Sequence, residues 1–274
     1  MKLGIDIGGT TINIGKVKDG VLIFKTTVPS FNPEATLEET EEYLISIIRD
    51  SLTPDIDSIG IGVPSVVDVE GGIVYNAANI PSWTEVHLKH YLEAALGVPV
   101  MINNDANCYA LGAARKIGCR ENEIFVCITL GTGVGIGVVV DGRILNGAHT
   151  GLGELTWIPY HDKPLEYWCG KSFFEDKGIN PAELSSLAEK GDSEALRLFA
   201  EYGRHLASLL AIVISAYDPH KIVFGGGLSN ANQFFETSML SRLEKIFPFP
   251  ESLKNLDISY LPQSDVAILG ASLL

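Results

Sequence analysis

Basic residues are scarce in this chain. Its 274 residues include 20 Lys and Arg against 34 Asp and Glu, which gives a formal net charge of −14. Nucleic acids and anionic membrane surfaces bind basic patches, so we expect neither of them as a partner of this chain.

Long apolar runs are also missing. The longest helical one, Leu206 to Tyr217, is shorter than the roughly 20 residues that cross a bilayer. Residues 1–8 carry Asp6 where a secretion signal would need an apolar stretch. We therefore expect a cytoplasmic protein with no membrane partner.

Cysteine is rare, and no two cysteines lie close together in the sequence. The four cysteines, Cys108, Cys119, Cys127 and Cys169, form no C-x-x-C motif. In a chain of this size without a secretion signal, such residues are reduced thiols that mostly lie in the core.

Glycine, by contrast, is concentrated at two turns that follow apolar strands. Residues 6–11 read Asp-Ile-Gly-Gly-Thr-Thr, and residues 130–135 read Leu-Gly-Thr-Gly-Val-Gly. Glycines at a turn let backbone N–H groups point inward and form a concave anion site. Thr10 and Thr11 can donate to phosphate oxygens, and Asp6 can hold a hydrated metal ion.

The two glycine turns belong to a longer repeat. Both hairpins end in an Asp-Gly dipeptide suited to tight turns, at residues 19–20 and 141–142. Strand 59–63 runs into Gly-Val-Pro-Ser, and its counterpart, strand 221–224, runs into three glycines at 225–227. A duplicated domain that closes around a nucleotide fits this pattern.

The predicted elements alternate between strands and helices in both halves. We expect strands within 2–27 and at 57–63, 98–103, 123–130, 134–140, 143–145, 221–224 and 257–261, and helices at 34–52, 84–97, 105–117, 181–190, 192–217, 230–246 and 266–274. This order predicts two mixed α/β domains with a cleft between them, residues 1–117 and 118–262, with the closing segment 263–274 packed back on the first.

Seven motifs run through the chain in one order. They are Asp6-Ile7-Gly8-Gly9-Thr10, Gly60-Ile61-Gly62-Val63-Pro64, Asn79-Ile80-Pro81-Ser82-Trp83, Asn103-Asn104-Asp105-Ala106-Asn107, Leu130-Gly131-Thr132-Gly133-Val134-Gly135, Gly153-Glu154 and Gly225-Gly226-Gly227. Over nearly its full length the chain resembles the ROK (repressor, ORF, kinase) sugar kinases, which share the actin-type ATPase fold. Repressors of this family carry an N-terminal winged helix, and a phosphate turn that starts at residue 3 favours the kinase branch.

The resemblance implies a role for each matching residue. Asp105 would be the general base, in a position where an aspartate could also simply cap the following helix. The implied sugar ligands are Asn79, Asn104, Glu154 and Glu175, where the two glutamates could also be plain surface acids. The implied nucleotide and phosphate ligands are Asp6, Gly8, Gly9, Thr10, Thr11, Gly131, Thr132, Gly133, Gly226 and Gly227. Asp6 would hold Mg²⁺ through water, Trp83 would pack in the core, and the family likeness implies a homodimer.

The chain departs from zinc-bearing members of the family at two places. Trp157 stands where those members have a histidine that contacts the sugar, and Cys169 is the one residue left of a three-cysteine cluster. A tetrahedral zinc site needs four ligands, so we expect no zinc. Apolar packing of Trp157, Trp168 and the pair 173–174 would replace it. An indole accepts no hydrogen bond, which leaves open a substituted or less polar sugar than glucose.

We therefore expect an enzyme that uses ATP and Mg²⁺ to phosphorylate a hexose, at O6 of glucose or a related sugar. Polyphosphate-using glucokinases of the family also lack the cysteine cluster, so polyphosphate stays open as the donor. Two other classes remain: a sugar- or nucleotide-sensing protein without catalysis, and a structural ATPase of the actin type with no sugar requirement.

Overall fold

The chain divides into two compact units. The computed structural model describes residues 1–77, 79–263 and 265–274. Unit 1 contains Met1–Cys119, Gly137–Leu152 and Ser264–Leu274, and unit 2 contains Arg120–Ile136 and Gly153–Gln263. The predicted division at residue 117 therefore differs for 137–152, which packs on the helix 105–117 of unit 1. Ser264, within the predicted closing segment, lies outside the described residues.

Unit 1 is built on a five-stranded mixed sheet. Its strand order is β3-β2-β1-β4-β8, where β1 pairs antiparallel with β2 and parallel with β4, and β8 extends the parallel part. The strands are β1 (Lys2–Ile7), β2 (Thr11–Lys18), β3 (Val21–Pro29), β4 (Ser58–Val63) and β8 (Val100–Asn104). The three-stranded meander predicted for the first residues is confirmed.

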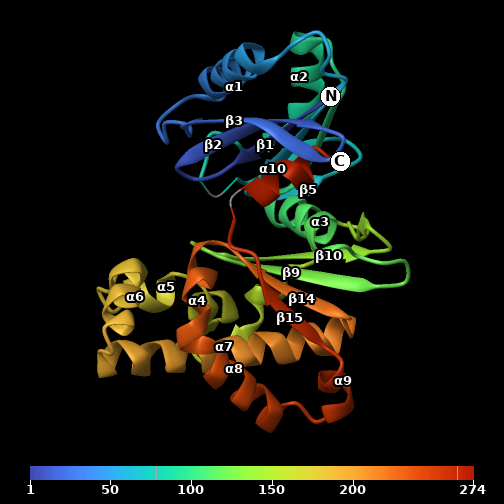
Figure 1. The fold of residues 1–274 in the computed structure, drawn as a ribbon. Helices are drawn as coiled ribbons and strands as arrows, with labels where there is room; N and C mark the ends of the chain where they lie inside the picture. The colour runs from blue at the N-terminus through green and yellow to red at the C-terminus, as the bar shows by residue number, and fades with distance from the viewer. Residues whose placement is uncertain (78, 264) are drawn as a thin grey trace. The chain divides into compact units, whose positions relative to one another are not determined.

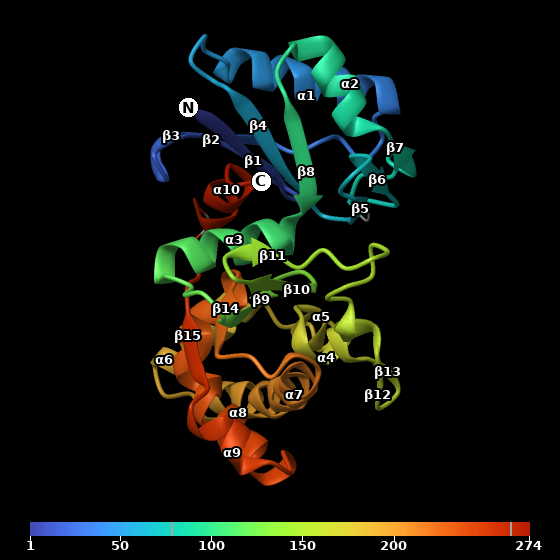
Figure 2. The ribbon, with the colours of Figure 1, turned by 90° about the vertical axis from the view of Figure 1, so that its right-hand side faces the viewer.

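Two pairs of helices cover the two faces of this sheet (Figures 1 and 2). The helices are α1 (Leu37–Ser51), α2 (Leu88–Leu96), α3 (Asp105–Ile117) and α10 (Asp265–Ala271). Helix α1 starts later than predicted, because Thr36 and Glu39 form a capping box that defines its first turn. A small sheet of β5 (Val66–Asp68), β6 (Ile73–Tyr75) and β7 (Glu85–Val86) was not predicted, since its strands are too short for a periodic pattern.

Helices α3 and α10 cross at a pair of glycines. A Cβ atom on Gly112 would collide with the Val266 carbonyl oxygen, and one on Gly270 would collide with the Cys108 carbonyl oxygen. The crossing therefore needs glycine at both positions, because the two backbones touch there.

A second five-stranded sheet repeats the strand order of the first. The second sheet has the order β11-β10-β9-β14-β15, with β9, β14 and β15 parallel. Its strands are β9 (Ile124–Leu130), β10 (Val134–Val140), β11 (Arg143–Ile144), β14 (Lys221–Gly225) and β15 (Asp257–Tyr260). The predicted mixed α/β fold with a duplicated plan is thus confirmed.

The remaining elements of unit 2 are mostly helices. They are the 3₁₀ turn η1 (Leu155–Trp157), the ribbon β12 (Pro159–Tyr160) and β13 (Lys163–Pro164), α4 (Leu165–Cys169), α5 (Ser172–Glu175), α6 (Pro181–Glu189), α7 (Ser193–Tyr217), the 3₁₀ turn η2 (Gly227–Ala231), α8 (Asn232–Ile246) and α9 (Pro250–Lys254). Helices α7 and α8 pack against each other along their length. Three of the four cysteines, Cys108, Cys127 and Cys169, are fully buried, as predicted.

Helix α7 is longer than its apolar run. At 25 residues, it is the one helix among the described residues whose length and composition would suffice to cross a membrane, and more than half of that apolar window is buried in the fold. Its first turns carry Glu194, Arg197 and Glu201, which form ion pairs on the exposed side. The predicted helix 192–217 is confirmed to within one residue, and the apolar run Leu206 to Tyr217 covers only its second half.

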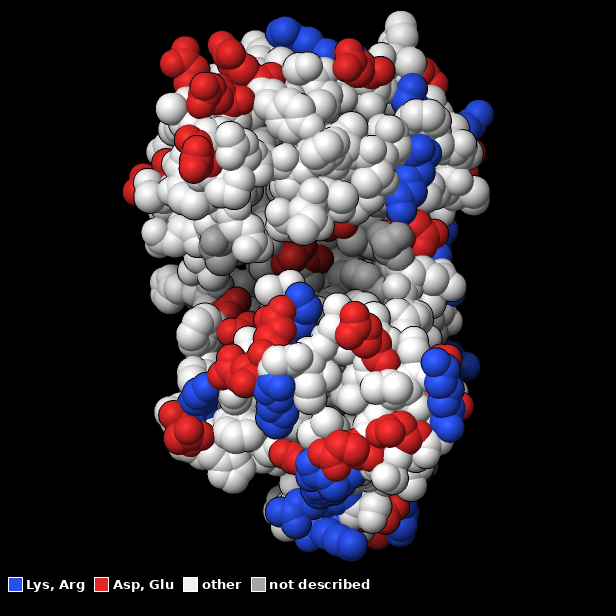
Figure 3. Space-filling model, turned by 90° about the vertical axis from the view of Figure 1, so that its left-hand side faces the viewer, with Lys and Arg blue, Asp and Glu red and all other residues white. Residues whose placement is uncertain are grey.

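Acidic and basic side chains are interspersed on one face of unit 2. Figure 3 shows blue side chains next to red ones there. Unit 2 contains exposed ion pairs such as Arg197 with Glu194, at 2.7 Å, and Lys254 with Glu251, at 2.7 Å. Such exposed pairs contribute little to the stability of the fold, because water and salt screen them.

Candidate active site

The parallel strands of unit 1 bring three separate motifs to one edge of the sheet. In the strand register, Asp6 of β1 lies opposite Gly62 of β4, and Gly62 lies opposite Asn103 of β8. Neighbouring strands lie about 4.8 Å apart, so the Cα atoms of Asp6 and Asn103 are roughly 10 Å apart. The carboxyl ends of parallel strands are where α/β proteins bind ligands.

Asp105 is the first residue of α3 and lies close to this edge. A Cβ atom on Gly62 would stand 3.4 Å from the Cα of Asp105 and 3.2 Å from the Sγ of Cys108. Glycine at 62 thus lets the first turn of α3 lie directly against the sheet. Both Asp105 and Asp6 raise the pKa of the buried Cys108 thiol, after the larger effect of burial, so both carboxylates act on the same spot.

Asn104, rather than Asp105, caps α3. Its side chain oxygen accepts from the backbone N–H groups of Ala106, at 2.9 Å, and Asn107, at 3.3 Å. The reason is that β8 runs one residue further than predicted, so Asn104 keeps an extended backbone and Asp105 becomes helical. The Nδ2 atom of Asn104 donates one of its two hydrogens to Ser65 O at 3.0 Å.

A buried asparagine network supports this helix start, and the sequence reasoning had missed it. Asn103 is 2% exposed. Its Oδ1 accepts from Asn107 Nδ2 at 2.9 Å, and its Nδ2 donates to Asn146 Oδ1 at 2.9 Å. The Asn103 side chain therefore ties α3 to the loop after β11. Among the described residues, no group hydrogen-bonds to the buried Oδ1 of Asn107.

The first glycine turn lies beside a predicted sugar ligand. Gly8 N donates to Thr11 O at 2.9 Å and closes the turn, while Gly9 and Thr10 are exposed. A Cβ atom on Gly9 would stand 3.1 Å from the Nδ2 of Asn79. The loop that carries Asn79 is anchored by Trp83, which is buried as predicted and donates to Thr40 Oγ1 at 2.8 Å.

Asp6 lies next to the last residue of β1, and its carboxylate is largely withdrawn from water. Burial raises its pKa, and a hydrogen bond from Asn13 Nδ2, at 3.2 Å, together with the charge of Lys25, opposes that shift. A carboxylate that loses water in this way is stabilised by a nearby cation. The Asp6 side chain therefore fits the predicted role of holding Mg²⁺ through water.

The second glycine turn, in unit 2, is held by a carboxylate that the sequence reasoning had missed. Gly131, Thr132 and Gly133 connect β9 to β10, and Val134 N donates to Glu166 Oε1 at 3.2 Å. The segment that carries Glu166 also bonds to the turn through Lys171 N and Gly131 O, at 3.0 Å. No local pattern marks Glu166, because it follows Val134 by 32 residues.

The three-glycine motif lies next to this turn. Gly226 has a φ of 80°, and a Cβ atom there would collide with the Leu130 carbonyl oxygen at the end of β9. Gly227 begins η2 and has open space where a Cβ would stand. Gly226 and Gly227 therefore join the second glycine turn at the carboxyl ends of two neighbouring parallel strands.

Glu154 stands directly before η1 in unit 2. Loss of water raises the pKa of its carboxyl group, a hydrogen bond from the Trp157 side chain lowers it, and the charge of Glu166 raises it again. Thr156, between them, is buried, while Trp157 is 62% exposed. The predicted apolar packing of Trp157 is therefore wrong, because three residues per 3₁₀ turn point Thr156 inward and Trp157 outward.

Glu175 ends the helical segment that begins near Glu166. Its Oε1 lies 2.6 Å from Lys171 Nζ, and both side chains are about half exposed. The segment 165–175 thus connects the second glycine turn with the second predicted sugar glutamate.

Aromatic side chains pack together around Trp168, in the segment for which no zinc site was predicted. The rings of Trp168 and His205 lie 4.7 Å apart, and Phe173 and Phe174 are fully buried, as predicted for this pair. Tyr160 Oη lies 3.3 Å from His205 Nδ1. Within the described part of the chain, no three His, Cys, Asp or Glu side chains gather as metal ligands.

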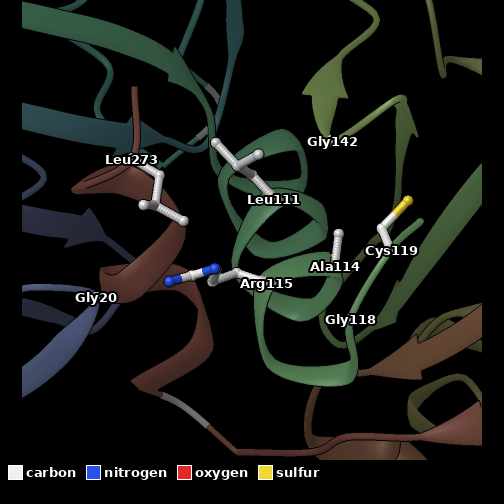
Figure 4. A pocket seen from close by; sticks show the side chains of 8 residues that line it. All are labelled: Gly20, Leu111, Ala114, Arg115, Gly118, Cys119, Gly142 and Leu273. Carbon is white, nitrogen blue, oxygen red and sulfur yellow. The ribbon is translucent and has the colours of Figure 1, made fainter. Parts of the chain in front are cut away.

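A separate hollow lies at the far end of α3, within unit 1 (Figure 4). Its volume is about 400 Å³, and the Arg115 side chain points into it. Its lining residues are Gly20, Leu111, Ala114, Arg115, Gly118, Cys119, Gly142 and Leu273. None of these is a predicted site residue, so the hollow is distinct from the strand ends described above.

Comparison with known proteins identifies the family of this chain. The chain matches the ROK family over residues 2–274. It belongs to the ROK family. The ROK chain is 29% identical to a glucokinase from Halalkalibacterium halodurans, with 88% of this chain and 87% of the relative covered. It is 32% identical to an N-acetyl-D-glucosamine kinase from Erwinia tasmaniensis, with 86% and 87% covered.

A solved ROK structure has the same fold. The glucokinase from Streptomyces griseus, in complex with glucose and AMPPNP, superimposes with a TM-score of 0.83 at 24% identity, covering 99% of this chain and 97% of that one. The family and the sugar-kinase class predicted from the sequence are confirmed by these relatives.

Proposed function

We propose that this ROK chain transfers the γ-phosphoryl group of ATP to a hydroxyl of a hexose, at O6 of glucose or a related sugar. The observation that carries the proposal is the meeting of Asp6, Asn79 and Asp105 at the ends of the parallel strands of unit 1. A phosphate turn, a sugar amide and a carboxylate are the groups that such a transfer needs. The two relatives named above act on glucose and N-acetyl-D-glucosamine.

Asp105 is the general base of the proposed reaction. As the sugar oxygen bonds to the γ-phosphorus, the carboxylate takes the hydroxyl proton, and the bond between the γ-phosphorus and the bridging oxygen breaks to release ADP. The position of Asp105 at the start of α3, beside Gly62, holds it at the strand ends. Bound Mg²⁺, held by Asp6 through water, would neutralise phosphate charge.

The remaining residues bind the two substrates. Asn79, Asn104, Glu154 and Glu175 bind sugar hydroxyls, because amides and carboxylates pair with adjacent hydroxyl groups. The backbone of both glycine turns, with Thr10, Thr11 and Thr132, binds the phosphates. Gly226 lets the chain turn close to Leu130, and the open space at Gly227 leaves room for the adenosine. We also propose that the enzyme works in the cytoplasm as a homodimer, which size-exclusion chromatography with light scattering would test.

ADP production with Mg-ATP tests the function. The panel contains glucose, mannose, glucosamine, their N-acetyl forms and fructose, with a blank that lacks sugar. ADP release above the blank with one sugar supports the kinase, and equal release with and without sugar would instead indicate an ATPase. If no sugar is phosphorylated with ATP but one is phosphorylated with polyphosphate, polyphosphate is the phosphoryl donor. Sugar binding without turnover on either donor would indicate a sensor.

A further inference from the structure

One arginine points into the hollow at the far end of α3 (Figure 4). The side chain of this residue, Arg115, is exposed, so a ligand can reach it. Among the described residues, no hydrogen-bond acceptor or carboxylate pairs with its guanidinium group. The next residue, Lys116, by contrast forms an ion pair with Asp265 at 3.0 Å. The N–H donors of the Arg115 guanidinium are therefore available to a bound anion.

The guanidinium group lies against a turn instead of extending into water. A Cβ atom on Gly20 would stand 3.2 Å from Arg115 Nη2 and 3.4 Å from its Nε. Arg115 also belongs to the last turn of α3, where a basic residue compensates the helix dipole. In Figure 4, however, the guanidinium lies towards Gly20 and away from Gly118, which caps the helix. Its position thus fits a negative group in the hollow better than the helix end.

Apolar side chains line the hollow beside the guanidinium. Leu111 and Ala114 come from α3, and Leu273 comes from the segment after α10. Leu111 and Leu273 are only partly buried by the fold, so a bound apolar group would remove more of their surface from water. The volume of about 400 Å³ is that of a small-molecule site. A matching ligand combines an anionic group with a short apolar chain.

Other charges around the hollow favour a ligand with one negative charge over a ligand with two. Asp19 precedes Gly20 and Asp141 precedes Gly142, so each of the two hairpin turns in the wall carries a carboxylate residue. The carbonyl end of α3 is also negative. These groups repel a doubly charged phosphate more strongly than a carboxylate. A carboxylate, in addition, forms two parallel hydrogen bonds with a guanidinium group.

We infer that the hollow binds a monocarboxylate with a short apolar chain. The carboxylate pairs with Arg115, and the chain contacts Leu111 and Leu273. Arg115 follows Asp105 by ten residues on α3, which is about 15 Å along the helix axis. The ligand therefore does not compete with the sugar, and the inference is independent of the proposed function.

Titration with hexanoate, followed in ¹H–¹⁵N spectra, tests the site. The Nε–H signal of Arg115, assigned by its loss in Arg115→Lys, should shift with a Kd on the order of 1 mM. Arg115→Ala should weaken binding about tenfold or more, as measured at the backbone amide of Gly20. Arg49→Ala removes a guanidinium that donates to Ala95 O elsewhere in unit 1, and it should leave the Kd unchanged. Equal affinity in the wild type and in Arg115→Ala would overturn the inference.

Chain length and head group test the two parts of the ligand separately. From butanoate to hexanoate, affinity should rise about fourfold for each added methylene. Leu273→Ala should lower the affinity for hexanoate more than that for butanoate. Hexanol keeps the chain without the charge, and it should bind about tenfold more weakly than hexanoate. An affinity that does not depend on chain length would contradict the apolar contact. Inorganic phosphate that binds more tightly than butanoate would overturn the monocarboxylate class.

Discussion

The glycine turn between β1 and β2 and the turn between β9 and β10 occupy the same position in two sheets of one strand order. In the first, Asp6 is the next-to-last residue of β1 and accepts a hydrogen bond from Asn13. In the second, Thr129 takes that place and donates to Gly135 O at 3.3 Å. The carboxylate near the second turn is Glu166, which comes from a distant segment.

The helices that follow the two sheets show a similar difference. Helix α3 follows β8 and starts with Asp105, and α10 follows β15 and starts with Asp265. Asp105 lies at the strand ends with Asp6, whereas Asp265 forms an ion pair with Lys116, at 3.0 Å. The duplicated backbone thus places a glycine turn and a helix that starts with aspartate after both sheets, while the two aspartates have different neighbours: the strand ends for Asp105 and Lys116 for Asp265.

The largest expected effect is a loss of turnover on substitution of Asp105 but not of Asp265. Asp105→Asn removes the proposed base, and kcat should fall by roughly a hundredfold to ten-thousandfold while sugar binding is retained. Asp265→Asn is the matched change in the other helix, and it should leave kcat within about twofold, since exposed ion pairs contribute little. Steady-state kinetics and sugar titration measure both. Full turnover in Asp105→Asn would remove this residue from the role of base.

The second prediction concerns the crossing of α3 and α10. Gly270→Ala places a methyl group against the Cys108 carbonyl, and the free energy of unfolding should fall by about 3 kcal/mol. Gly151→Ala is the control, because a Cβ atom there would meet its nearest neighbour at an ordinary 3.4 Å. Urea denaturation of both variants checks the difference. Equal stability would show that the two helices can separate at no cost.

The third prediction concerns the hydrogen bond between Glu166 and the second glycine turn. Glu166→Ala leaves Val134 N without its side-chain acceptor, so KM for ATP should rise by about tenfold. Glu166→Gln keeps an acceptor oxygen and should restore most of the affinity. Because the role is one of positioning, KM for the sugar should change less than KM for ATP. If the glutamine variant is as weak as the alanine variant, charge rather than the hydrogen bond matters.

The smallest effect concerns the pH dependence of unit 2. Burial among aromatic rings lowers the pKa of His205 from 6.5 to about 4, so the folded state favours neutral His205. The unfolded chain binds this proton first, and stability is therefore full above about pH 6.5 and is lost as the pH falls towards 4. Because the ring is only partly buried, the loss should be about 1 kcal/mol.

The difference in unfolding free energy between wild type and His205→Gln, followed from pH 7 to pH 4, measures this effect. His87→Gln is the control, since the exposed His87 lacks these aromatic neighbours. A wild-type slope that persists in His205→Gln would assign the pH dependence to other groups.

Local patterns predicted most of the fold. Helix 105–117 and strand 134–140 have the bounds that the sequence predicted, because capping residues and glycine turns act over a few neighbours. The meeting of Asp6 with Asp105 follows from parallel strands, which align their ends.

The missed features depend on contacts that are distant in sequence or on single-residue shifts. Glu166 reaches Val134 across 32 residues, and Asn103 reaches Asn146 across 43, so no periodic pattern marks either contact. One extra residue in β8 transferred the helix cap from Asp105 to Asn104. A 3₁₀ turn that buries Thr156 sent Trp157 outward, which apolarity alone had predicted incorrectly.

Each unit contains at least one buried cysteine, so the reactivity of its thiols can measure the unfolding of that unit. Cys108 lies in unit 1, and Cys127 and Cys169 lie in unit 2, and burial raises the pKa of all three thiols. Alkylating reagents react with exposed thiolates, so these residues are protected until the surrounding structure unfolds. Labelling rates followed peptide by peptide would therefore time the unfolding of the two units separately, with no probe added to the chain.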